Sequence, residues 1–164
     1  MQHRRIAPGP GQESVWDYPR PPAVVPTDAR IVVRLGGHVV AETERAVRVL
    51  ETSHPPVFYL PADDFSDGAL VEAPGSSICE FKGRARYFDV RGGATVAAGA
   101  AWDYPEPWEG YGSLLGRVAV YPAAMSSCTV DGEPVVAQDG DFYGGWITSA
   151  VVGPFKGAPG TLGW

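Results

Sequence analysis

Glycine and proline recur along the whole chain and divide it into short segments. The 164 residues include 21 glycines and 16 prolines, which are spread without a repeat. Such residues mark turns. Between them lie short runs rich in apolar residues, such as 31–35, 57–60 and 116–121. In the first run, Ile31, Val33 and Leu35 alternate with Val32 and Arg34, and this period of two is typical of strands. We therefore predict a mostly β fold of about eight to ten short strands, built as several short antiparallel sheets around one core with little helix.

Two turn motifs and two apolar runs refine this prediction. Gly36-Gly37 predicts a hairpin over 30–42, and Asp131-Gly132 predicts a second hairpin over 128–137. Residues 77–90 read as two strand pieces that break at Lys82-Gly83. Residues 44–51 fit a short helix or a strand, and their short length favours the strand. Residues 145–152 are expected to form one last strand.

The chain length suits one domain rather than two. Residues 1–12 are expected to be a flexible lead-in and residues 13–164 to form a single β domain. Within that domain, the segment 13–29 holds four prolines, a Trp and a Tyr. It is therefore expected to be an extended arm on the domain surface, because proline fixes φ and removes a backbone donor.

The formal net charge of −6 bears on partners and location. A negative field repels nucleic-acid phosphate, and the best basic stretch (Lys82, Arg84, Arg86) is too small to overcome it, so nucleic-acid binding is not expected. No run approaches the roughly 20 apolar residues of a membrane helix, and two cysteines are too few for a disulfide scaffold. We expect a soluble, cytoplasmic protein with free thiols and no membrane contact, either a monomer or a weak dimer.

The densest cluster of polar and aromatic candidates includes several residues at points where strands meet prolines or glycines, where pockets often open. Its members are Glu51, His54, Tyr59, Asp64, Cys79, Lys82, Tyr87 and Trp102. A functional interpretation is a cleft with Glu51 as general base, Lys82 as an anion-binding cation, and aromatic walls. Cys79 is a candidate nucleophile if Lys82 lowers its thiol pKa. In the structural interpretation, Glu51 and Lys82 form an ion pair, Cys79 is buried and inert, and the aromatic residues are core.

Two groups of aspartates are candidate metal ligands, Asp63-Asp64-Asp67 and Asp139-Asp141. Neither shows a recognisable catalytic spacing, and the phosphate-loop pattern G-x-x-x-x-G-K-[ST] is absent from the sequence. We therefore predict no metal site and interpret both groups as exposed turn carboxylates. No cofactor follows from the sequence.

Several local strings resemble a known bacterial family, domain of unknown function 427 (DUF427), which is sometimes labelled nucleotidyltransferase-like. The matching strings are ESVWDYPRPP, Leu50-Glu51-Thr52, Tyr59-Leu60-Pro61, Cys79-x-Phe-Lys-Gly83, Ala101-Trp102, Gly144-Gly145-Trp146-Ile147 and GPFKGAPGT. The resemblance implies a β-tent fold and no particular activity. It also implies a departure, since many β-tent proteins bind zinc through two Cys-x-x-Cys pairs, and this chain has none.

Two strings occur twice. Trp16-Asp17-Tyr18-Pro19 returns as Trp102-Asp103-Tyr104-Pro105, and Phe81-Lys82-Gly83 returns as Phe155-Lys156-Gly157. Their spacings of 86 and 74 residues differ, so the sequence does not decide between duplication and chance.

Three functions stay open. The first is a small-molecule-binding domain with an aromatic and polar cleft. The second is an enzyme that acts on a nucleotide or another anionic metabolite through Glu51, Cys79 and Lys82. The third is a protein-interaction module that uses the proline-rich arm.

Overall fold

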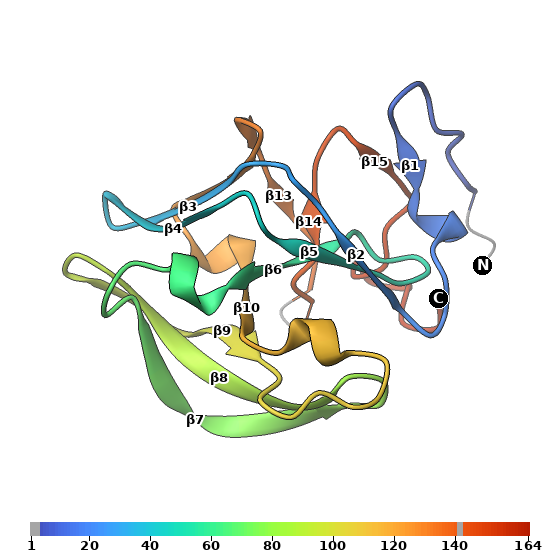
Figure 1. The fold of residues 1–164 in the computed structure, drawn as a ribbon. Coiled ribbons are helices and arrows are strands. Elements are labelled where there is room, and N and C mark those ends of the chain that lie inside the picture. The colour runs from blue at the N-terminus through green and yellow to red at the C-terminus, as the bar shows by residue number, and fades with distance from the viewer. Residues whose placement is uncertain (1–3, 141–142) are drawn as a thin grey trace.

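The computed structural model describes residues 4–140 and 143–164, and its regular elements are mainly strands. Within these residues, fifteen strands form four sheets (Figure 1). The helical elements there are 3-10 turns of three residues each: η1 (Val15–Asp17), η2 (Ala62–Asp64), η3 (Gly112–Leu114) and η4 (Pro122–Ala124). The predicted mostly β fold with several sheets is confirmed. The β-tent topology that the resemblance implies stays a prediction.

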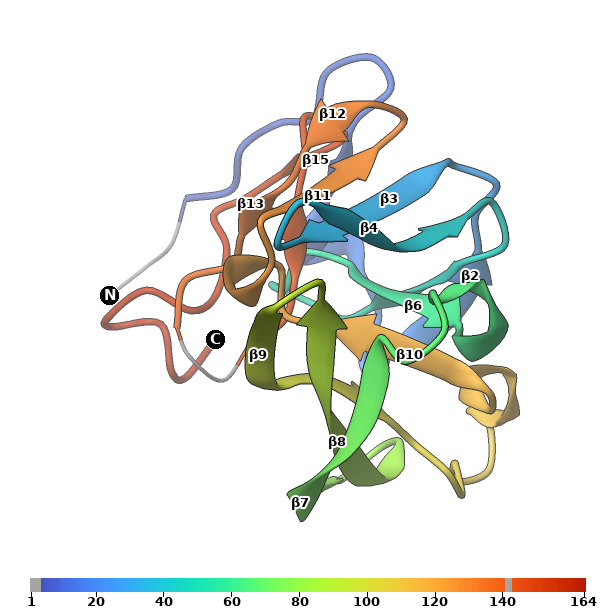
Figure 2. The ribbon, with the colours of Figure 1, turned by 90° about the vertical axis from the view of Figure 1, so that its left-hand side faces the viewer.

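The largest sheet has seven strands and runs through the molecule. Its order is β2 (Ala23–Pro26), β5 (Val47–Leu50), β6 (Val57–Pro61), β10 (Arg117–Val120), β9 (Thr95–Asp103), β8 (Gly83–Gly92) and β7 (Leu70–Cys79). All neighbours in it pair antiparallel. The strand assignment of 44–51 is confirmed in β5. Residues 77–90 contain two strand pieces as predicted, and the turn between them spans 80–82, just before Gly83. Figures 1 and 2 show β7, β8 and β9 as a curved layer that ends at the edge strand β7.

A four-stranded sheet packs on one face of the large sheet. Its order is β12 (Glu133–Pro134), β11 (Ser127–Val130), β3 (Ile31–Leu35) and β4 (His38–Thr43). Both predicted hairpins are present in it, and their turn residues take positive φ: 58° and 81° at Gly36 and Gly37, and 48° and 82° at Asp131 and Gly132. Two successive positive φ values match the right-handed twist of the paired strands.

The period-two pattern of the strands divides their side chains between two clusters. Phe58 and Leu60 on β6 point into the main core against the four-stranded sheet, where Leu60 is completely buried. The intervening Tyr59 points to the opposite face and joins a second, aromatic cluster with Trp102 and Ala119. Successive side chains of a strand lie on opposite faces. The large sheet therefore has an aliphatic face that faces the core and an aromatic face.

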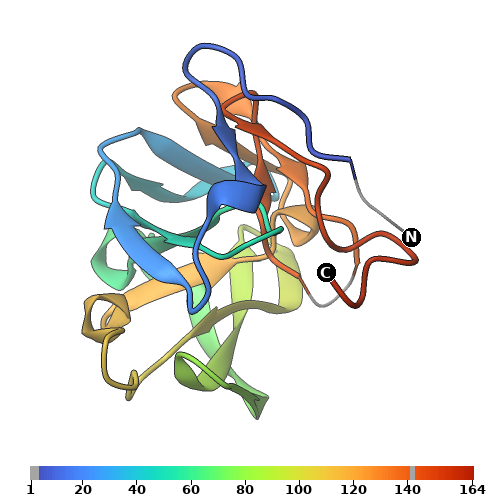
Figure 3. The same cartoon turned by 90° about the vertical axis from the view of Figure 1, so that its right-hand side faces the viewer.

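The two ends of the described chain pack together. β1 (Glu13–Ser14) pairs with β15 (Val151–Val152), and β13 (Val136–Ala137) pairs with β14 (Trp146–Ile147). Figure 3 shows the N-terminal and C-terminal segments side by side. The β1–β15 pair is parallel, an exception to the predicted antiparallel pairing. The prediction of one strand over 145–152 was wrong, because a turn in which Val151 N–H donates to Thr148 O separates two short strands.

The proline-rich arm 13–29 is built into this arrangement. Val15 and Tyr18 are buried in a third cluster with Leu50 and Val151. Ahead of the arm, Ile6 N–H donates to Gly153 O at 3.1 Å, and Gln12 Nε2 donates to Ser149 O at 2.8 Å. The described part of the lead-in thus lies along the C-terminal segment, and its flexibility stays a prediction. None of the helical turns in the described residues is long and apolar enough to cross a bilayer.

Candidate functional site

A cavity of about 380 Å³ opens on the aromatic face of the large sheet. Its first wall is the sheet itself, and its second wall comes from the turn before β6 together with Gln138, Tyr143, Gly144 and Lys156. This volume lies at the lower end of the range for small-molecule sites, which is roughly 300–1,000 Å³. The cavity is large enough for a ring with one or two substituents.

Strand pairing places the aromatic side chains of the first wall next to one another. Tyr87 on β8 is opposite Trp102 on β9, and Trp102 is opposite Ala119 on β10. Trp102 Nε1 donates to Tyr59 Oη at 3.1 Å, and Tyr87 Oη lies 2.7 Å from Ser77 Oγ. Burial raises the pKa of Tyr59, so its hydroxyl stays neutral. These hydrogen bonds and paired strands fix the rings before any ligand arrives.

Lys82 brings a positive charge to this apolar wall. It follows the tip of the β7–β8 hairpin, where its carbonyl accepts from Trp108 N–H at 3.0 Å. The residue is only 9% exposed. Its Nζ lies 5.9 Å from the centre of the Tyr104 ring, and no carboxylate of the described chain pairs with it. A mostly buried lysine without a counter-ion among the described residues gains from a nearby negative charge, so an anion in the cavity would stabilise Lys82.

The turn between β5 and β6 supplies Glu51 and His54. His54 N–H donates to Glu51 O at 3.0 Å, and Ser53 takes a positive φ of 71° to close this turn. The proline-rich arm supports the turn, because Thr52 N–H donates to Pro19 O and Arg20 Nη2 donates to Thr52 O. The arm is therefore part of the scaffold that positions the site.

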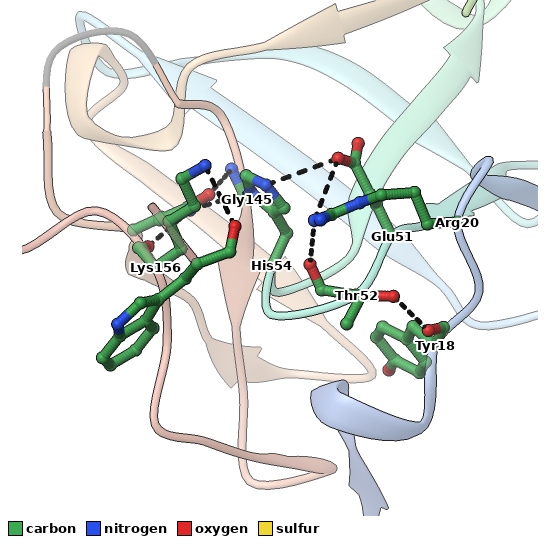
Figure 4. A network of polar contacts seen from close by, with 9 residues as sticks. Tyr18, Arg20, Glu51, Thr52, His54, Gly145 and Lys156 are labelled. Atoms are coloured by element: carbon green, nitrogen blue, oxygen red, sulfur yellow. Dashed lines mark hydrogen bonds and ion pairs between the residues drawn. The ribbon is translucent and has the colours of Figure 1, made fainter. Parts of the chain in front are cut away.

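Glu51 pairs with His54 and Arg20 through one oxygen. Its Oε2 lies 3.6 Å from His54 Nε2 and 3.6 Å from Arg20 Nη2, as Figure 4 shows. Both distances exceed those of a strong hydrogen bond, so these contacts are mainly electrostatic. The structural interpretation required a Glu51–Lys82 ion pair. The structure instead pairs Glu51 with Arg20 and His54.

Gln138 fixes the orientation of His54 from the other side. Its Oε1 accepts from Gly145 N–H at 3.1 Å, and its Nε2 donates to Lys156 O at 2.6 Å (Figure 4). These two backbone partners determine which end of the amide carries the hydrogens. Gln138 Nε2 also lies 3.3 Å from His54 Nδ1, which must then be the acceptor. The imidazole proton is thus on Nε2 and faces Glu51.

Burial, together with the positive charges of Lys156, Arg20 and Lys82, lowers the pKa of His54 from 6.5 to about 4. The ring is therefore neutral at pH 7 and holds a single tautomer. This site does not contain an imidazolium at physiological pH. The cationic groups that border the cavity are lysine side chains.

The second wall depends on a close approach of the chain near Gly144. A Cβ at this position would lie 2.3 Å from Trp102 Cη2, so only glycine lets the segment approach the tryptophan. Beside it, the Tyr143 ring lies 5.3 Å from the His54 ring, and Lys156 Nζ lies 5.9 Å from the Tyr143 ring centre. Lys156 Nζ also donates to Trp164 O at 3.3 Å. Its ammonium group is thus less available to a ligand than that of Lys82.

The structure brings seven of the eight sequence-derived candidates to this cavity: Glu51, His54, Tyr59, Cys79, Lys82, Tyr87 and Trp102. Glu51, Cys79 and Lys82 therefore share one cavity, as both the binding and the enzyme hypotheses require. Asp64 does not line the cavity. It lies in η2, where its carboxylate accepts from Thr43 Oγ1 at 2.6 Å and from Arg45 Nη2 at 2.9 Å, and these bonds lower its pKa.

Within residues 4–140 and 143–164, no three His, Cys, Asp or Glu side chains gather as metal ligands would. Of the two aspartate groups weighed from the sequence, Asp141 lies outside the described residues. Both described cysteines are free thiols. Cys79 is half-buried at the cavity, and burial raises the pKa of Cys128 to about 12.

Sequence reasoning missed most of the second wall and part of the first: Tyr104, Tyr121, Gln138, Tyr143, Gly144 and Lys156. The repeated strings were a sequence signal for two of these residues, Lys156 and Tyr104. In the repeated Phe-Lys-Gly string both lysines, Lys82 and Lys156, line the cavity, and Tyr104 belongs to the second Trp-Asp-Tyr-Pro string. Nothing local to Gln138 indicates that its side chain reaches back to His54 across 84 residues.

Comparison with known proteins gives one family assignment. Residues 23–131 match the family described as "Domain of unknown function (DUF427)". A search of curated proteins returned no match. The matched range includes Glu51, His54, Cys79, Lys82 and Trp102, and it covers more than half of the chain. The chain therefore belongs to the DUF427 family, whose description names no activity.

Proposed function

We propose that this protein binds a small anionic organic molecule in the cavity on the aromatic face of the large sheet. The observation that carries the proposal is Lys82, a residue that is only 9% exposed, whose ammonium group lies near the Tyr104 ring and has no carboxylate partner among the described residues. Charge-assisted hydrogen bonds to an anion are the strongest that a lysine makes. A bound anion would supply the charge that Lys82 lacks.

The aromatic walls favour a ligand that has a flat apolar part. Tyr59, Trp102 and Tyr121 present rings to the cavity, and the last two have centroids 4.5 Å apart. A cationic ligand fits less well, because Lys82 and Lys156 already lie near the faces of Tyr104 and Tyr143. A further cation would be repelled by both ammonium groups. We therefore propose an anion attached to an aromatic or similarly flat group.

The experiment is a thermal-shift titration of the full chain with phenyl phosphate, benzoate and indole-3-acetate, and with the neutral analogues phenol and benzamide. A ligand at 100 times its Kd adds about 2.7 kcal/mol to the stability of the folded state. For a chain of this size that corresponds to a rise in Tm of about 5–10 °C. We expect at least one aromatic anion, and neither neutral analogue, to give such a rise.

Two variants complete the test. Lys82→Met removes the charge and keeps the apolar stem, so we expect it to abolish the rise in Tm. Because Lys82 has no counter-ion within residues 4–140 and 143–164, unliganded Lys82→Met should be at least as stable as the wild type. Arg84→Met removes an exposed positive charge two residues away, which does not line the cavity, and should leave the rise intact. Equal losses in both variants, or equal rises with the neutral analogues, would contradict the proposal.

The cellular setting is part of the same proposal. Both cysteines are free thiols, one of them half-buried at the cavity, which suits a reducing compartment. We accordingly place the proposed binding function in the cytoplasm.

A further inference from the structure

The cavity holds a second group with unused binding capacity, the carboxylate of Glu51. Its Oε2 faces His54 Nε2 and Arg20 Nη2, while Oε1 has no hydrogen bond or ion pair within the described part of the chain. Figure 4 shows the two oxygens in these different roles. The carboxylate lines the cavity, and its side chain is 24% exposed. One oxygen is therefore held by the protein and the other is open to a ligand.

The network behind Glu51 determines the polarity of this open position. Gln138 receives its orientation from Gly145 N–H and Lys156 O, and it leaves His54 Nδ1 as an acceptor. The proton on His54 Nε2 therefore points at Glu51 Oε2, as does Arg20. Both donor groups thus face Oε2 at 3.6 Å. The other oxygen, Oε1, can only accept a hydrogen bond from a ligand, since an ionised carboxylate has no hydrogen to donate.

From this arrangement we infer the chemical class of the ligand: a flat ring that carries an anionic group for Lys82 and, in addition, an N–H or O–H donor for Glu51 Oε1. This inference rests on the function proposed above and adds a second recognition group to it. An apolar ring substituent at the same place would leave a partly buried carboxylate without a hydrogen bond, which is costly. The N–H or O–H donor of the ligand should therefore determine which anions are preferred, and Lys82 should determine the affinity for anions in general.

The test uses pairs of probes with the same shape and charge that differ only in the donor. One pair is indole-3-acetate and 1-benzothiophene-3-acetate, and a second is 4-aminobenzoate and 4-methylbenzoate. Isothermal titration of the full chain should give at least about tenfold tighter binding for a donor-bearing member than for its partner, the size expected for one charge-assisted hydrogen bond.

Glu51→Gln provides a reversal that a merely structural role would not produce. The His54 and Arg20 donors should attract the amide oxygen of Gln, so its NH2 group should face the cavity. The preference for the donor-bearing probe should then disappear, and 4-acetylbenzoate, which offers an acceptor, should bind better than 4-aminobenzoate. Glu109→Gln removes the same charge from an exposed loop position away from the cavity and should keep the wild-type preference.

The outcomes separate this inference from the proposed function. Equal binding of both members of each pair to the wild type, or an unchanged preference in Glu51→Gln, would overturn the role of Glu51 and leave anion binding by Lys82 standing. A donor preference that survives in Lys82→Met together with undiminished affinity would instead overturn the role of Lys82. Absence of binding by every anionic probe would overturn both.

Discussion

The protonation of His54 should make the stability of this protein depend on pH in a defined window. The pKa of His54 falls from 6.5 to about 4 in the folded protein because the ring is buried and lies near Lys156, Arg20 and Lys82. The unfolded chain therefore binds the proton at a higher pH than the folded chain does. The stability linked to this group is complete above pH 6.5, is lost progressively as pH falls from 6.5 to 4, and then stays constant.

The size of the effect follows from the shift in pKa. Each pKa unit corresponds to about 1.4 kcal/mol, so the full loss is about 3 kcal/mol, of which most should be lost by pH 4.5. This is a large part of the stability of an ordinary domain, which is roughly 5–15 kcal/mol. The measurement is urea unfolding of the wild type and of His54→Asn at pH 7.5 and at pH 4.5.

His54→Asn serves as the reference because its side-chain oxygen can replace Nδ1 as the acceptor for Gln138, while it has no group that titrates in this range. Other acidic groups, such as Glu13 and Asp64, have lowered pKa values and also lose stabilising contacts in acid. They are common to both proteins, so their effect cancels in the difference. The stability advantage of the wild type should shrink by about 2–3 kcal/mol between the two pH values. A difference that does not change with pH would refute the reasoning.

Two further predictions concern the cavity walls. Gly144→Ala should lower the free energy of unfolding by about 1–3 kcal/mol and weaken probe binding, because its Cβ would lie 2.3 Å from Trp102 Cη2. Urea unfolding and ligand titration measure the two effects. Gly112→Ala, whose Cβ would have nothing within 4 Å, is the control and should change neither quantity. Iodoacetamide followed by mass spectrometry should label Cys79 in the folded protein at least about a hundredfold faster than Cys128, whose buried thiol has a raised pKa and reacts only after local opening. Similar labelling rates of the two cysteines would contradict this assignment of their surroundings.

The sequence predicts the large elements of this fold because their signals are local. The Gly36-Gly37 and Asp131-Gly132 turns specify their hairpins through positive φ, and alternation along 57–60 specifies β6 and its two faces. The same alternation places Tyr59 on the face opposite Leu60. Even the ambiguous segment 44–51 is a strand, β5, as its short length favoured.

The candidate site follows from the sequence only in part. Glu51, Lys82 and Trp102 come from turns and strand ends, where local signals indicate a pocket. Gln138 and Gly144 act through long-range contacts, with His54 and with Trp102, and no local pattern announces such contacts. Asp64 shows the opposite error, because its acidic turn resembles a site. Its carboxylate is instead bonded to Thr43 and Arg45, which come from β4 and the segment that follows it and are distant in the sequence.

The C-terminal wall of the cavity flanks two short strands, β13 and β14, which pair with each other. β13 and β14 have two residues each, and the family match ends at residue 131, before either strand begins. A ligand that contacts both walls would cross-link them, so the order of the C-terminal segment and the occupancy of the cavity should rise together.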